Sequence, residues 1–219
     1  MPANEHVVLV HGLWMHGAVM RWMARRIERA GYVVHCFSYA SVRVSLAENA
    51  NRLAAFCDAL NVRGLHLVGH SLGGLLIARM LEARSHSARL DIGRVVLLGS
   101  PFVDSYAARQ LSRARIGAMA VGASVGDWLR DARPGNLARY EIGVIAGNRA
   151  LGLGRVVARH LPAPHDGTIS VAETVVPGAR DSVVLNVSHS EMILSVAVVR
   201  QVCEFLRRGQ FTRAEGARS

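Results

Sequence analysis

Short apolar runs alternate with segments of helical periodicity along most of the chain. The runs are too short for helices and rich in valine, leucine and isoleucine, so each predicts a buried strand; they cover 6–10, 32–37, 65–68, 94–98, 141–146 and 182–187. Apolar residues spaced three and four positions apart predict helices over 18–30, 46–60, 72–83 and 191–208. Apolar strands separated by helices indicate a parallel sheet covered on both faces. The pattern therefore predicts a single α/β domain.

Two stretches interrupt this alternation, 101–138 and 147–179. Both are longer than an ordinary connection, so we expect them to build a short lid insert and a long loop insert beside a substrate pocket. The first stretch contains the small apolar segment 116–125. That segment forms either a lid over an acyl chain or an ordinary core helix, together with neighbouring Phe102, Trp128 and Leu129.

The composition fits one ordered domain. Of the 219 residues 51% are hydrophobic and only 19% are charged, which is enough apolar material for a core. We expect the domain to span 1–208 and the polar segment 209–219 to be a flexible tail. No window holds the roughly 18 apolar residues of a spanning helix. The start of the chain has no basic region of the signal-peptide kind, so the expected location is the cytoplasm.

The charge of the chain is strongly positive. The formal net charge is +10, and all 26 basic residues are arginines. Because these arginines are scattered, we expect a solvated basic surface and no nucleic-acid partner; attraction to anionic substrates or lipid headgroups is the alternative. The three cysteines lie in apolar stretches without ligand spacing, so we expect reduced core residues and no metal.

The most specific motif is Gly69-His70-Ser71-Leu72-Gly73, between a predicted strand and a predicted helix. A turn this tight requires glycines two positions before and after the serine, and Gly74 gives further room. The serine is then exposed at a helix N-terminus, where backbone N–H groups stabilise developing negative charge. This context predicts that Ser71 is a nucleophile rather than part of a plain glycine-containing turn.

A second motif, Val10-His11-Gly12-Leu13-Trp14, follows the first predicted strand. With both motifs the chain resembles the α/β-hydrolase superfamily, specifically its compact bacterial esterases and lipases, from about residue 6 to 208. The resemblance implies a single-domain minimal fold of about six mostly parallel strands with helices on both faces. It further implies an oxyanion hole formed by the backbone N–H groups of Leu13 and Leu72, and a structural role for His11.

A serine nucleophile needs a base and an orienting carboxylate, which follow it in the chain in the order acid, then histidine. His189 lies just past the last predicted strand, where this superfamily has its catalytic histidine; His160 and His165 are the rivals. The segment from Asp166 to Ser170 resembles the acid loop of some of these hydrolases. Asp166 comes twenty positions after Ala146, so the chain must loop out and return. The main rival acid is Asp104.

The resemblance implies hydrolysis of carboxylic esters of short to medium acyl chain through an acyl-enzyme, with no metal and no cofactor. The substrate would be a small-molecule ester or a lipid, in a pocket lined by Trp14, Met15 and His70. Alternatives on the same triad are a lipase or phospholipase-type acylhydrolase with peripheral membrane contact, and an acyltransferase or thioesterase. The sequence leaves the oligomeric state open.

Overall fold

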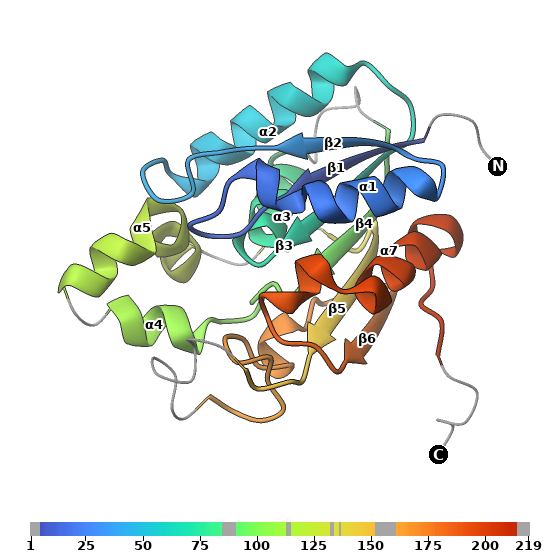
Figure 1. The fold of residues 1–219 in the computed structure, drawn as a ribbon. Helices are drawn as coiled ribbons and strands as arrows, with labels where there is room; N and C mark the ends of the chain where they lie inside the picture. Colours follow the sequence, from blue (N-terminus) through green and yellow to red (C-terminus); the bar gives the residue numbers. More distant parts are fainter. Residues whose placement is uncertain are drawn as a thin grey trace.

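The computed structural model describes residues 5–84, 91–112, 115–131, 134–135, 137–151 and 161–213, without the side chains of 111–121. Six strands form one parallel sheet in the order β2-β1-β3-β4-β5-β6 (Figure 1). They are β1 (His6–Val10), β2 (Val33–Phe37), β3 (Leu65–His70), β4 (Ile92–Leu98), β5 (Glu141–Gly147) and β6 (Asp181–Leu185). The predicted strands are all present, with bounds that differ by up to two residues.

Helices cover both faces of this sheet. The α-helices are α1 (Arg21–Arg29), α2 (Leu46–Leu60), α3 (Leu72–Ala83), α4 (Tyr106–Ser112), α5 (Arg115–Arg130) and α7 (Val196–Arg208). The 3₁₀ helices are η1 (Gly17–Met20), η3 (Ala172–Thr174) and η4 (Glu191–Leu194). Helices α1 and α7 lie in front of the sheet in Figure 1, and α2, α3 and α5 pack on the other face. The predicted α/β fold with helices on both faces is confirmed.

The alternation of side chains along β1 shows why the sheet has two cores. Val8 and Val10 pack with α2 and α3, while Val7 and Leu9 pack with α1 and α7. Because successive side chains of a strand point to opposite faces, an uninterrupted apolar strand supplies both cores at once.

The first insert holds α4 and α5, and its later part is core. Gly122 has φ 77° and interrupts α5, after which the Ala123 N–H donates to the Val42 carbonyl at 2.9 Å. Trp128 is 2% exposed, donates from Nε1 to the Pro101 carbonyl at 3.2 Å and packs edge-on against Phe102. Phe102 and Trp128 therefore belong to a core and not to a lid. The side chains of 116–121 lie outside the described residues.

The start of the expected flexible tail is folded onto the domain. Phe211 is 5% exposed, with its ring centroid 4.9 Å from that of Phe205, and its N–H donates to Asp181 at 2.8 Å. The expectation of a free tail from residue 209 is wrong for 209–213, because burying one aromatic ring outweighs the polar character of its neighbours. Residues 214–219 lie outside the described residues. Within the described part, no helix has the length and apolar character needed to cross a bilayer.

Candidate active site

Ser71 occupies a strained turn between β3 and α3. Its backbone has φ 53° and ψ −122°, a conformation that costs a residue with a side chain about 1–3 kcal/mol. Two hydrogen bonds hold it: the Ser71 N–H donates to the Leu98 carbonyl at 2.8 Å, and its carbonyl accepts from the Gly74 N–H at 3.0 Å. Strain that persists inside a well-bonded turn is a mark of functional sites.

The glycines around this turn are required by close packing. A methyl group at position 73 would lie 2.3 Å from the Val10 carbonyl oxygen, and one at position 69 would lie 2.6 Å from the Gly74 Cα. Both distances are shorter than van der Waals contact. The N-terminus of α3 therefore lies directly against the end of β1, which brings the two sequence motifs together.

His189 and Asp166 form a buried pair. The His189 Nδ1–H donates to Asp166 Oδ2 at 2.7 Å, and Asp166 is 1% exposed. The other carboxylate oxygen accepts the backbone N–H groups of Thr168, at 2.9 Å, and Ile169, at 2.7 Å. These three donors fix the position of the carboxylate. With Nδ1 committed to Asp166, Nε2 of His189 is the ring atom that can exchange a proton.

The chain between β5 and Asp166 leaves the sheet and returns to it. It leaves through hydrogen bonds of the Asn148 and Arg149 N–H groups to the carbonyls of Leu185 and Val187, at 3.1 and 3.2 Å. It returns so closely that a methyl group on Gly147 would lie 2.8 Å from the Asp166 Cβ. Asp166 thus lies at the carboxyl end of β5 although it is twenty positions from Ala146 in sequence.

Gly99, directly after β4, shows that the pair lies beside the strand next to β3, which leads into Ser71. A methyl group on Gly99 would lie 3.2 Å from both Asp166 Oδ2 and His189 Nδ1. Strand β4 pairs with β3, which leads into Ser71. The structure therefore brings Ser71, Asp166 and His189 to the carboxyl edge of the same sheet.

The loop after β1 lies against the serine. A methyl group on Gly12 would lie 3.2 Å from the Ser71 Cβ, so the backbone leading to Leu13 passes beside Ser71. Leu72 is the first residue of α3, and a backbone N–H at that position has no acceptor within its helix. Trp14, next in the loop, has φ 57° and donates its N–H to Ser41 Oγ at 3.2 Å.

His11 is held as a neutral structural residue. Its Nδ1–H donates to the Gly12 carbonyl at 2.8 Å, and Nε2 accepts the Tyr39 N–H at 3.2 Å. Burial lowers the pKa of His11 below its ordinary value. Both ring nitrogens are occupied, which leaves neither for proton transfer to a substrate.

The three residues expected to line the pocket differ in how far they are exposed. Trp14 is 61% exposed, and Met15 is half-buried against the core that contains α1 and α7. His70 is only 1% exposed, and its ring packs against that of His189 with centroids 4.8 Å apart. A side chain without exposed surface does not line an open pocket, so that expectation is wrong for His70.

Asp104 and His165, the described rivals of Asp166 and His189, do not form the buried pair. The Asp104 side chain is partly exposed and pairs with Arg109 at 2.6 Å. His165 accepts the Gly167 N–H on Nδ1 at 3.1 Å, within the acid loop, and His160 lies outside the described residues.

The sequence reasoning missed two carboxylates that hold the site. Glu173 accepts the Ser170 N–H at 2.7 Å and the Tyr106 N–H at 2.5 Å, which joins the acid loop to α4. Glu191 accepts the Ser188 N–H at 2.9 Å beside His189. The sequence contains a signal that could have identified them, because Ser170–Glu173 and Ser188–Glu191 both have the serine-to-glutamate spacing of a capping box.

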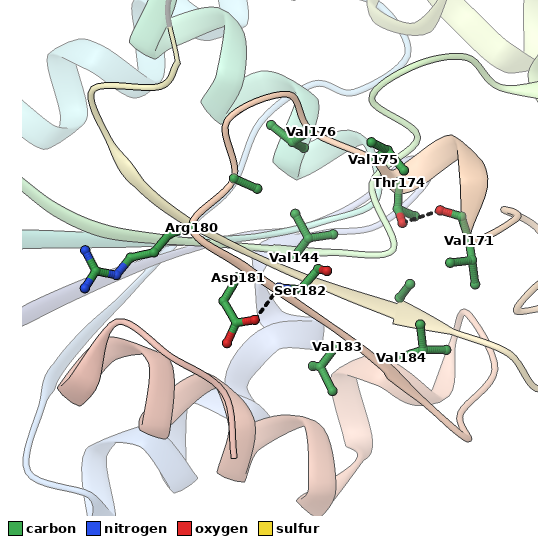
Figure 2. A pocket seen from close by; sticks show the side chains of 12 residues that line it. Val144, Val171, Thr174, Val175, Val176, Arg180, Asp181, Ser182, Val183 and Val184 are labelled. Carbon is green, nitrogen blue, oxygen red and sulfur yellow. Dashed lines mark hydrogen bonds between the residues drawn. The ribbon is translucent and has the colours of Figure 1, made fainter. Parts of the chain in front are cut away.

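A cavity of about 360 Å³ lies elsewhere, along β5 and β6 (Figure 2). It is covered by the segment that contains η3, and its lining includes Val144, Thr174, Val176, Ser182 and Val184. None of Ser71, Asp166 and His189 lines it. Among the described residues, no group of three histidine, cysteine or acidic side chains is arranged to hold a metal ion.

Comparison with known proteins gives a family and several structural neighbours. The model of the alpha/beta hydrolase family matches residues 7–207, and no curated protein matches the chain. The mature form of the Bacillus licheniformis lipase BlEst2 is similar with a TM-score of 0.77 and 20% identity, covering 95% of this chain and 93% of that one. A monoacylglycerol lipase from Paleococcus ferrophilus has a TM-score of 0.62 and 17% identity, covering 94% and 96%. The metagenomic carboxyl esterase MGS0156 has a TM-score of 0.65 and 18% identity, covering 86% of this chain and 65% of that one.

Proposed function

Because the chain belongs to the alpha/beta hydrolase family, we propose that it is a serine hydrolase that cleaves carboxylic esters of short to medium acyl chain. The observation that carries this proposal is the meeting of a strained Ser71 turn with a buried Asp166–His189 pair at one sheet edge. A nucleophile, a base and an orienting carboxylate are the groups that acyl transfer requires.

In the proposed reaction, Ser71 Oγ attacks the ester carbonyl while its proton passes to His189 Nε2. Asp166 stabilises the imidazolium that results, through the Nδ1–H hydrogen bond. The backbone N–H groups of Leu13 and Leu72 stabilise the oxyanion, each by about 3–4 kcal/mol in the transition state. His189 then protonates the leaving alcohol, and water, activated by the same histidine, releases the acid from Ser71.

A second candidate is an acylhydrolase that works at an anionic membrane surface. Exposed apolar side chains surround the edge that carries the site: Trp14 is 61% exposed, Leu194 in η4 54% and Val19 in η1 37%. Arg21 and Arg25 are exposed on the adjoining helix α1, in a chain of net charge +10. Apolar anchors beside cationic residues favour binding to anionic lipid.

The test of the proposed function is active-site labelling. A fluorophosphonate probe should modify wild type once at neutral pH, and Ser71→Ala should abolish the mass increase seen by intact-protein mass spectrometry. His189→Ala should lower kcat by several orders of magnitude with KM little changed, because the base acts in the transition state. Wild type that stays unlabelled would overturn the assignment of the nucleophile.

Rates on p-nitrophenyl esters of increasing chain length then define the substrate. We expect the highest kcat/KM for uncharged esters of short to medium acyl chain, in solution. Activity that appears only with anionic phosphatidylglycerol vesicles, and not with soluble esters, would select the membrane candidate instead.

A further inference from the structure

His70, the residue before the proposed nucleophile, is buried among the three loops that form the site. Its Nε2 lies 3.0 Å from the His189 carbonyl oxygen, and its ring packs against the His189 ring at 45°. On the other side, a methyl group on Gly12 would lie 3.1 Å from His70 Nδ1. His70 thus ends β3, the strand that leads into Ser71. Its side chain lies against the loop that carries His189 and against the loop that contains Gly12.

The hydrogen bond defines the tautomer of His70. A carbonyl oxygen only accepts, so the proton must be on Nε2 of His70. Nδ1 is buried and has no hydrogen-bond partner among the described residues. A proton there would be left without an acceptor, so the ring is neutral, with Nε2 as its one donor.

The surroundings keep this ring neutral. Burial, followed by the charge of the nearby His189, lowers the pKa of His70 to about 3. The hydrogen bond to the His189 carbonyl and, less strongly, Asp166 act in the opposite direction, and His11 lowers the pKa slightly. A neutral His70 matters for the proposed reaction because His189 must itself become a cation. A second charge on the adjacent ring would oppose that step.

We propose that His70 is a positioning residue: its Nε2–H holds the His189 backbone so that the His189 ring keeps its orientation between Ser71 and Asp166. This inference rests on the proposed function and deepens it. The Asp166 side chain fixes the ring from Nδ1, and His70 fixes the loop from the backbone side. The His189 N–H donates to the Asp166 carbonyl at 2.9 Å, so with His70 both backbone groups of the base are engaged.

Three variants separate the donor from the ring. His70→Gln places an amide N–H near the position of Nε2, whereas the amide of His70→Asn is too short to reach the His189 carbonyl. His70→Phe keeps the ring and removes the donor. We expect the Asn and Phe variants to lose roughly 10- to 100-fold in kcat with KM little changed, because a small displacement of a catalytic group costs about this much. The Gln variant should recover most of the loss.

The assay measures kcat and KM on p-nitrophenyl butyrate, per active site titrated with a fluorophosphonate, so that misfolded protein does not count. His66→Phe is the matched control: His66 is a buried histidine on the same strand, bonded to Glu5 and the Arg94 N–H, and its replacement should leave kcat per site unchanged. If His70→Phe does not fold, the Gln and Asn pair decides the question.

Nitrogen NMR of labelled histidine gives a readout independent of activity. Wild-type His70 should show the neutral ring with the proton on Nε2 down to about pH 5. Wild-type kcat in the Asn or Phe variant, a Gln variant as impaired as Asn, or a proton on Nδ1 would each overturn the positioning role. A Ser71→Ala variant with wild-type rate would instead show that the proposed function is wrong.

Discussion

Replacing Asp166 by asparagine tests the proposed triad most sharply. Oδ1 of Asp166 accepts two backbone N–H groups, from Thr168 and Ile169. In the variant these two N–H groups donate to the amide oxygen of the asparagine, so its NH₂ group faces His189 Nδ1. An NH₂ group only donates, so Nδ1 must become an acceptor and the imidazole proton moves to Nε2. Nε2 is then unable to take the proton of Ser71.

The expected loss in kcat is on the order of 10⁴, as for the equivalent change in a serine protease. The shape of the side chain is unchanged and the buried carboxylate is replaced by a neutral group, so the fold should survive. Stopped-flow or steady-state hydrolysis of p-nitrophenyl butyrate measures the loss, with circular dichroism as the check on folding.

Asp104→Asn is the matched control. The Asp104 side chain is partly exposed and pairs with Arg109. Ion pairs of this kind contribute at most about 1 kcal/mol to stability, so kcat of this variant should stay within a factor of about two of wild type. An Asp166→Asn enzyme with nearly wild-type kcat, beside a strongly impaired Asp104→Asn, would refute the reasoning.

Three further predictions concern stability. Gly73→Ala should lower the free energy of unfolding by about 1–3 kcal/mol or more in urea titration, because its methyl group would lie 2.3 Å from the Val10 carbonyl; an unchanged midpoint would contradict the packing described. Trp128→Ala should lower the free energy of unfolding by about 3–5 kcal/mol because its ring is buried in the core, and a change near zero would contradict that burial. Burial lowers the pKa of His70 from 6.5 to about 3, so below about pH 6.5 the unfolded chain binds a proton that the native state does not. Wild type should therefore lose stability on acidification more steeply than His70→Gln, by about 1.4 kcal/mol per pH unit between about pH 6 and 4; equal slopes would show that His70 is protonated in the native state.

The parts of the fold that depend on local pattern could be predicted from the sequence. Uninterrupted apolar runs such as 6–10 identify central strands, and the glycines around Ser71 identify the turn that follows β3. Chain order alone placed His189 after the last strand. These features are local because periodicity and turn geometry act over a few residues.

The parts that depend on non-local contacts could not be predicted. Nothing near Asp166 in sequence indicates that its side chain packs against Gly147, since the two residues come from separate segments of the chain. The burial of His70 depends on the His189 loop, more than a hundred residues away, and the docking of Phe211 depends on Asp181, thirty residues earlier. His70 was expected to line the pocket because it lies next to Ser71 in the motif. Phe211 was expected to be part of a free tail because its sequence neighbours are polar.

Because the chain returns to Gly147, the placement of the Asp166–His189 pair is set by contacts at the two ends of the segment between Arg149 and His165, and not by the length of that segment. The departure is fixed by the bonds of Asn148 and Arg149 to the β6 side, and the arrival by the hydrogen bonds around Asp166. Closing a longer loop between two fixed points costs only about 0.6 kcal/mol for each doubling of its length. Insertions between Arg149 and His165 should therefore change the length of this segment at little cost, while Asp166 and His189 keep their positions.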